Sequence, residues 1–127
     1  MFHPLYPIGV FMDAGSQPTD GSEFSKQEIL QYLARTGDEV EETFLGIQDE
    51  DLVEILDGFI DTAYVALTGA IRAVGLEKAC LAWDAVVDAN LAKVDGRHGP
   101  VVIDNSTGKI LKPEGWTAPD IEGIING

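Results

Sequence analysis

Apolar residues recur at helical spacing through much of the chain, and this pattern predicts an all-α fold. At about 100° per residue, the apolar side chains of residues 52–74 fall on one broad arc, typical of a core-facing helix. They are Leu52, Leu56, Phe59, Ile60, Ala63, Leu67, Ala70, Ile71 and Val74. The preceding segment has a similar arc of Ile29, Leu33, Val40 and Phe44. We therefore expect two amphipathic helices that bury these side chains.

The beginning of the chain has few helical signals. Three prolines and three glycines in residues 1–24 leave room for one short helix near residues 7–14. Ser25 and Glu28 have the spacing of a capping box, in which Ser25 accepts a hydrogen bond from the third residue on and Glu28 reaches back. The second helix is therefore expected to begin directly after Ser25.

Further signals set the later boundaries. The pair Thr36-Gly37 predicts that the second helix either kinks or begins again there. Gly75 is expected to end the third helix. A fourth helix is predicted over residues 76–94, with Ala79, Trp83, Val86, Val87, Leu91 and Val94 inward.

The last part of the chain differs in composition. Residues 95–127 are rich in glycine and proline, and residues 101–111 predict a hairpin that turns at residues 105–108. Trp116 is either a packing anchor of this tail or a group that stacks on a base, and packing is favoured. The 127 residues suit one domain, a four-to-five-helix bundle with a C-terminal extended tail or hairpin.

Acidic residues are concentrated in residues 36–71, which contain no lysine or arginine. The ten acids are Asp38, Glu39, Glu41, Glu42, Asp49, Glu50, Asp51, Glu54, Asp57 and Asp61. On the helical wheel, the last three form one row, and Glu39 and Glu42 lie about 60° apart on the preceding helix. Helices joined by the short segment GIQDED should lie antiparallel, so the two rows are expected to face each other.

Such rows are often solvated helix faces, but two features favour a crevice. Adjacent like charges destabilise a helix, and no lysine relieves them here. Residues 62–71 carry no charge on any side, so the sector of Asp57 and Asp61 continues into Val65 and Thr68. Carboxylates crowded in a crevice either take up protons or bind a hard cation. Mg²⁺ suits oxygen ligands and often bridges to substrate phosphates.

These motifs resemble the MazG-like and phosphoribosyl-ATP pyrophosphohydrolase-like group of all-α nucleoside triphosphate pyrophosphohydrolases. Residues 39–42 and 54–61 are similar to its paired acidic motif, and residues 10–18, 57–76 and 88–93 are similar to its first, third and fourth helices. The tail, residues 108–121, resembles the end of many short, often phage-encoded, members. The last acid pair of the family is written Glu-x-x-Asp, whereas Gly58 stands three residues before Asp61. Asp57 or Glu54 would then take the role of that glutamate.

The resemblance implies hydrolysis of a nucleoside triphosphate to monophosphate and pyrophosphate. The implied cofactor is Mg²⁺, with Mn²⁺ as a substitute and two or more ions per site. The implied metal ligands are Glu39, Glu42, Glu54, Asp57 and Asp61, of which Glu39, Glu42 and Asp61 are the catalytic candidates. The implied substrate-binding residues are Phe11, Gln17, Asn90, Lys93, Lys112 and Trp116.

Relatives form dimers or tetramers, so a homodimer or homotetramer is expected. The phage-like tail favours a (deoxy)guanosine triphosphate as substrate. Phosphoribosyl-ATP is an enzymatic alternative. From a different class, the chain is also compatible with an inert acidic helical module that binds a partner or a metal.

Charge and cysteine content narrow these choices. The net charge of −14 argues against binding to nucleic acid or to an anionic membrane, because both need a basic surface. Six of the eight basic residues lie between residues 72 and 112, where they are available to a phosphate. Cys80 is a single cysteine, expected in the core, and it fits a reducing cytoplasm, that of the host if the chain is phage-encoded. No export signal is visible, and residues 62–71 are too short to span a bilayer.

Overall fold

The structure is a computed structural model that describes residues 2–127, and it confirms the all-α prediction. The described residues form no β-strand. The helices are α1 (Tyr6–Ala14), α2 (Lys26–Gln48), α3 (Leu52–Val74), α4 (Leu76–Leu91) and α5 (Ile121–Asn126).

The chain divides into two compact units, residues 1–79 and residues 80–127. The first unit contains α1, α2 and α3, and the second contains most of α4 together with the tail and α5. Each unit is described by itself below. That the whole chain is one domain stays a prediction.

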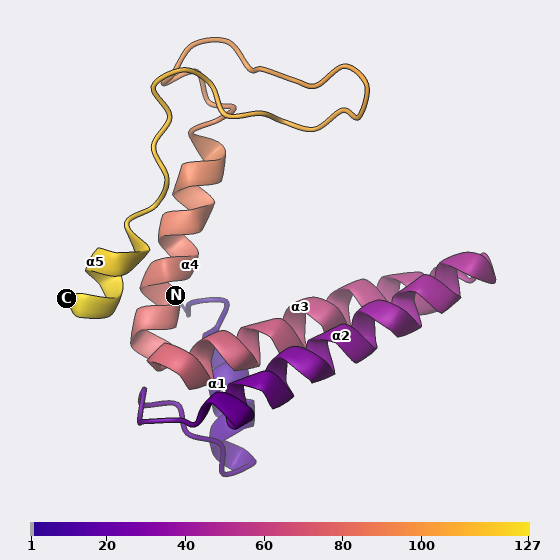
Figure 1. The fold of residues 1–127 in the computed structure, drawn as a ribbon, viewed down its shortest axis with the longest axis vertical. Coiled ribbons are helices and arrows are strands. Elements are labelled where there is room, and N and C mark those ends of the chain that lie inside the picture. The colour runs from indigo at the N-terminus through magenta and orange to yellow at the C-terminus, as the bar shows by residue number, and fades with distance from the viewer. Residues whose placement is uncertain (1) are drawn as a thin grey trace. The chain divides into compact units, whose positions relative to one another are not determined.

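The antiparallel pair α2 and α3 forms the long hairpin of the first unit (Figure 1). A Cβ atom added to Gly58 would overlap Thr43 Oγ1, and one added to Gly69 would lie 3.3 Å from Tyr32 Cβ. One added to Gly46 would lie 3.0 Å from the Cβ of a residue in the first turn of α3. Glycines therefore let the two backbones approach closely along this seam.

The predicted capping box is only half correct. Ser25 Oγ accepts a hydrogen bond from Glu28 N at 3.1 Å and caps α2. The Glu28 carboxylate does not reach back but binds Arg72, with a 2.6 Å contact from Arg72 Nε to Glu28 Oε2. The guanidinium of Arg72, which is 3% exposed, also donates to the carbonyl oxygens of Ser22 and Glu23. Arg72 thus fastens residues 22–28 to α3.

The second helix neither kinks nor restarts at Thr36-Gly37, because α2 is continuous through these residues. Thr36 Oγ1 donates instead to the carbonyl oxygen of Tyr32 at 3.0 Å, within the helix. Gly75 ends α3, as predicted, with a φ of +89° that favours glycine.

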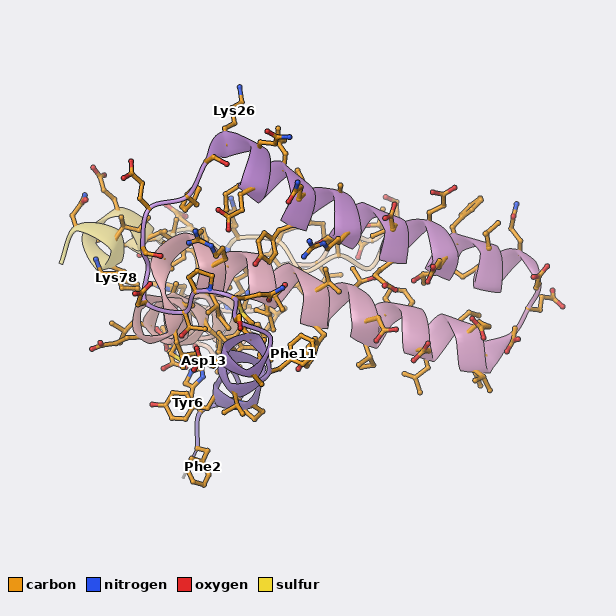
Figure 2. The ribbon with its side chains drawn as sticks, turned by 90° about the horizontal axis from the view of Figure 1, so that it is seen from below. Phe2, Tyr6, Phe11, Asp13, Lys26 and Lys78 are labelled. Carbon is orange, nitrogen blue, oxygen red and sulfur yellow. The ribbon has the colours of Figure 1, made fainter. Side chains whose placement is uncertain are left out.

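Helix α1 packs on α3 and supplies much of the buried core of the first unit. Pro7 lies in its first turn, where a missing N–H costs nothing. Leu5, Met12 and Ile71 are the largest fully buried side chains. Figure 2 shows Phe11 on the side of α1 next to α3, where its ring meets Tyr64 edge-on with the centroids 5.5 Å apart.

The predicted burial of the two apolar arcs is wrong for most of their residues. Only Ile71 of those two sets is buried, and the exposed members include Leu33, Val40, Phe44, Phe59 and Ile60. The reason is geometric: α2 and α3 meet through Gly46, Gly58 and Gly69, and this seam leaves the bulky apolar side chains beside it.

In the second unit, α4 ends at Leu91 instead of residue 94. Ala79, the last residue of the first unit, is buried as expected. The inward placement of the other predicted residues, which lie in the second unit, is wrong. The exposed residues are Trp83, Val86, Val87, Leu91 and Val94.

The tail forms one antiparallel bridge, between Ile103 and Ile110, around a turn that Asp104 stabilises by accepting from Ser106 N. None of the described helices is both long enough and apolar enough to cross a membrane.

Candidate functional site

The seam of the α2–α3 hairpin fixes which acids face one another. Residues Tyr32 and Gly69, and likewise Thr43 and Gly58, are opposed across the seam. In an antiparallel pair, this register places Glu39 level with Thr62, next to Asp61, and Glu42 level with Phe59, two residues from Asp57. The acid rows of the two helices are therefore level with each other, as the sequence predicts.

The electrostatics of Glu39 show that the rows also interact. Partial burial raises the pKa of Glu39 above its usual value, and repulsion by Glu42 and Asp61 raises it further. A hydrogen bond with Glu42 and repulsion by Asp57 act in the same direction. The four carboxylates Glu39, Glu42, Asp57 and Asp61, which we call the acid cluster, thus come from two helices and share one environment.

The acid cluster has the right atoms for a hard cation, because carboxylate oxygens are the ligands that Mg²⁺ prefers. Within residues 2–127, however, no three acid, histidine or cysteine side chains converge closely enough to hold an ion as they stand. Their mutual repulsion gives a reason, since uncompensated carboxylates keep apart. Holding Mg²⁺ would require rotation of these side chains toward one another.

One predicted ligand, Glu54, differs from the rest. Glu54 lies in the first turn of α3, opposite Gly46, and is not among the main causes of the pKa shift of Glu39. A side chain at position 58 would require a shift of Thr43, because a Cβ added to Gly58 would overlap Thr43 Oγ1. Asp57, one residue earlier, lies within reach of Glu39 instead.

Two predicted substrate-binding residues lie in the first unit, Phe11 in helix α1 and Gln17 in the loop that follows it. Phe11 packs on Tyr64, which follows Asp61 by three residues and is therefore about one helical turn from it. Gln17 Oε1 is buried and has no hydrogen-bond partner among the described residues. A buried, unpaired amide oxygen is uncommon in a folded protein, and it is available to accept a hydrogen bond.

The second unit brings the other four predicted substrate-binding residues together. Lys93 Nζ lies 5.0 Å, and Lys112 Nζ 5.2 Å, from the centroid of the Trp116 ring. Asn90 Oδ1 accepts a hydrogen bond from Lys93 Nζ at 3.1 Å. Trp116 Nε1 donates to the carbonyl oxygen of Ala89 at 2.7 Å, so the indole is anchored to α4. Trp116 thus has the packing role expected of it, and the ammonium groups of Lys93 and Lys112 lie beside its ring.

Two arginines bind acidic groups or backbone carbonyls of this chain, and the single cysteine is buried. Arg72 is occupied by residues 22–28, which removes it from the predicted set of phosphate-binding cations. Arg97 donates to Asp95 and Asp88, whose carboxylates raise the pKa of Arg97. Burial raises the pKa of the Cys80 thiol, as expected for a core residue and not for a nucleophile.

Sequence reasoning missed Tyr64 and the buried role of Arg72. The signal for Tyr64 was its spacing of three from Asp61 within an uncharged segment, which placed it on the same side of α3. A search against family models and curated proteins gives no match for this chain.

Proposed function

We propose that the chain hydrolyses a (deoxy)nucleoside triphosphate to the monophosphate and pyrophosphate in an Mg²⁺-dependent reaction. The observation that supports this proposal is the acid cluster, in which burial and the neighbouring carboxylates of Glu42, Asp61 and Asp57 raise the pKa of Glu39. A group of carboxylates without a compensating cation is a favourable place for divalent ions that also bind phosphates.

The chemistry follows from the donor set. Glu42, Asp57 and Asp61 would hold the ions, with Glu54 as a further ligand from the same helix. Bound Mg²⁺ would neutralise charge on the phosphates and lower the pKa of the attacking water. Glu39, the carboxylate of the acid cluster that is then not used as a ligand, would accept the proton from that water.

The remaining residues would recognise the nucleotide. In the second unit, Lys93 and Lys112 offer positive charge to a phosphate, and Trp116 offers an aromatic surface. In the first unit, Gln17 Oε1 is an acceptor without a partner. The resemblance of the tail to that of phage-encoded members is the ground on which we favour a (deoxy)guanosine triphosphate.

A nucleotide panel tests the reaction. The full chain is incubated with Mg²⁺ and each of the common ribonucleoside and deoxyribonucleoside triphosphates, and with phosphoribosyl-ATP, and pyrophosphate and orthophosphate are measured separately. We expect pyrophosphate and a monophosphate, fastest with a guanosine nucleotide. Release of orthophosphate alone would reject cleavage between the α and β phosphates. No turnover with any nucleotide would favour the inert acidic module.

We also propose that the chain works as a homo-oligomer in a reducing cytoplasm. The support for assembly is the large exposed apolar surface of the first unit. The support for the compartment is the single, buried cysteine.

A further inference from the structure

Trp116 brings two lysines of the second unit to one aromatic ring. Lys93 follows the end of α4, and Lys112 lies in the tail. Their ammonium groups are 5.0 Å and 5.2 Å from the centroid of the same indole ring. Both distances are within the range of a cation–π attraction. One ring is therefore the common partner of two like charges.

Only uncharged groups orient this arrangement. Asn90 Oδ1 accepts a hydrogen bond from Lys93 Nζ at 3.1 Å, while Asn90 Nδ2 donates to the carbonyl oxygen of Val86 within α4. The indole is held in a similar way, because Trp116 Nε1 donates to the carbonyl oxygen of Ala89 at 2.7 Å. These contacts place the two ammonium groups without neutralising their charge.

The positive charge of the two lysines is not balanced by the part of the chain that the structure describes. Neither ammonium group forms a salt bridge with a carboxylate there, whereas Arg72 and Arg97 both do. Acids outnumber lysines and arginines by 22 to 8 in this chain, so pairing with a carboxylate would be the ordinary outcome for a lysine. Two unpaired cations on one ring repel each other, and an anion that contacts both relieves this repulsion.

We infer that Trp116 is a positioning residue, which holds Lys93 and Lys112 together as a receptor for a chain of linked phosphates. Linked phosphates carry several charged oxygens, so one such anion can contact both ammonium groups, each of which acts as a point charge. The inference rests on the proposed function, since the polyphosphate of a nucleotide has this chemistry. It assigns the ring of Trp116 to the two cations and not to stacking on a base.

The tail completes the receptor through a tight turn. Trp116 N donates to the carbonyl oxygen of Pro113 at 3.1 Å, and Gly115 within the turn has a φ of +86°, which favours glycine. The turn begins directly after Lys112, so it brings this lysine back to the ring that follows it in the chain. The receptor therefore needs the tail to lie on α4, where Trp116 anchors it.

Calorimetric titration of the full chain with inorganic pyrophosphate tests the receptor, at low ionic strength and without Mg²⁺ or nucleotide. Lys93→Met and Lys112→Met should each raise the dissociation constant by about 10-fold, because each removes one charge-assisted contact. Lys109→Met removes the same charge from the same tail, at a lysine that is not beside Trp116, and is the control. Its affinity should stay near that of the parent chain.

Two substitutions of Trp116 distinguish positioning of the cations from packing alone. Trp116→Leu removes the aromatic ring and should raise the dissociation constant by about 10-fold, whereas Trp116→Phe keeps a ring for the cations and should stay within about threefold of the parent chain. Trp83→Leu, at the other tryptophan of the chain, is the control and should not change the affinity. Circular dichroism checks that all variants stay helical.

Three results would overturn the inference: no binding of pyrophosphate by the parent chain, equal weakening by Lys109→Met and Lys112→Met, or equal weakening by Trp116→Phe and Trp116→Leu. Binding of guanosine, which has no phosphate, would also overturn it if Trp116→Leu abolished that binding, because the ring would then stack on a base. Failure of the proposed reaction is a separate result, since turnover is measured with Mg²⁺ and nucleotides. A chain that binds pyrophosphate but hydrolyses no nucleotide would keep the receptor and lose the reaction.

Discussion

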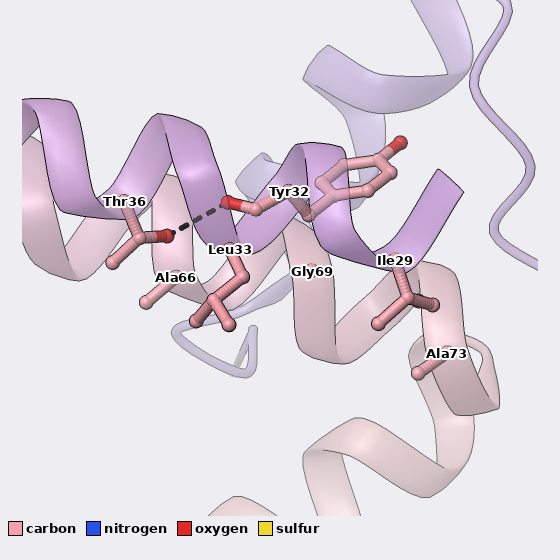
Figure 3. A pocket seen from close by; sticks show the side chains of 7 residues that line it. All are labelled: Ile29, Tyr32, Leu33, Thr36, Ala66, Gly69 and Ala73. Atoms are coloured by element: carbon pink, nitrogen blue, oxygen red, sulfur yellow. Dashed lines mark hydrogen bonds between the residues drawn. The ribbon is translucent and has the colours of Figure 1, made fainter. Parts of the chain in front are cut away.

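The two faces of the α2–α3 hairpin expose different kinds of side chain. On one face, burial and the other three carboxylates of the acid cluster raise the pKa of Glu39. The other face has two apolar hollows, one lined by residues that include Ile29, Leu33 and Ala73 (Figure 3) and one lined by residues that include Phe44 and Phe59. Elsewhere in the same unit an acid has its cation, as Glu28 has Arg72. The hairpin thus closes along its own seam, and the two faces beside the seam differ in kind, one acidic and one apolar.

The largest effect should come from removing one charge of the acid cluster. Asp61→Asn keeps the shape of the side chain but removes a candidate ligand, and loss of a metal ligand should lower turnover by at least about 100-fold. Mg²⁺ should also stop stabilising the fold, since a bound ligand raises stability only through its affinity for the folded state. Pyrophosphate release and Tm with and without Mg²⁺ are the two measurements.

The control for this prediction is Glu41→Gln. Glu41 precedes Glu42 on α2, is exposed and does not contribute to the pKa shift of Glu39. It removes the same kind of charge, so turnover and the Mg²⁺ effect on Tm should stay near those of the parent chain. Full activity of Asp61→Asn would remove Asp61 from the site.

A smaller effect on stability is expected from adding a methyl group inside the α2–α3 seam, in comparison with the same change outside it. Gly58→Ala adds a methyl group that overlaps Thr43, and overpacking typically costs about 1–3 kcal/mol. Gly37→Ala makes the same change on α2 where nothing lies within 4 Å, so it should stabilise the chain by up to about 1 kcal/mol through helix propensity. Urea denaturation at one fixed protein concentration compares them. A gain of stability in both variants would contradict the close approach at Gly58.

Much of the fold could be predicted from the sequence, because caps and breakers act locally. The predicted start of the second helix, the bounds of the third and the short helix near residues 7–14 agree with the structure within one residue, whereas α2 continues three residues into the predicted connection. Burial could not be predicted as well, since periodicity identifies an apolar side but not what covers it. The seam instead uses glycines, such as Gly58 and Gly69, which carry no hydrophobic signal.

The candidate site shows the same limit. The spacing of Glu39, Glu42, Asp57 and Asp61 was enough to predict that they face one another, because a short connection forces the helices to be antiparallel. The partner of Arg72 was not predictable in this way, since Glu28 is 44 residues away in the chain. Long-range pairs of this kind depend on register, which the glycine seam sets.

The smallest effect concerns the protonation of the acid cluster itself. The pKa of Glu39 is raised in the folded chain, first by burial and then by Glu42 and Asp61. The contribution of the Glu39 carboxyl group to stability is therefore complete below the pKa that Glu39 has in the unfolded chain. This contribution is lost as the pH rises through the pKa that Glu39 has in the folded chain. Glu39→Gln keeps an uncharged side chain at every pH, so its Tm should exceed that of the parent chain at pH 7, without Mg²⁺, and the difference should shrink toward pH 4. Glu41→Gln, which lowers the net charge equally, accounts for the general effect of charge. A Tm difference for Glu39→Gln that does not change with pH would show that Glu39 ionises without interference from the other acids, and the face would then resemble an ordinary solvated surface.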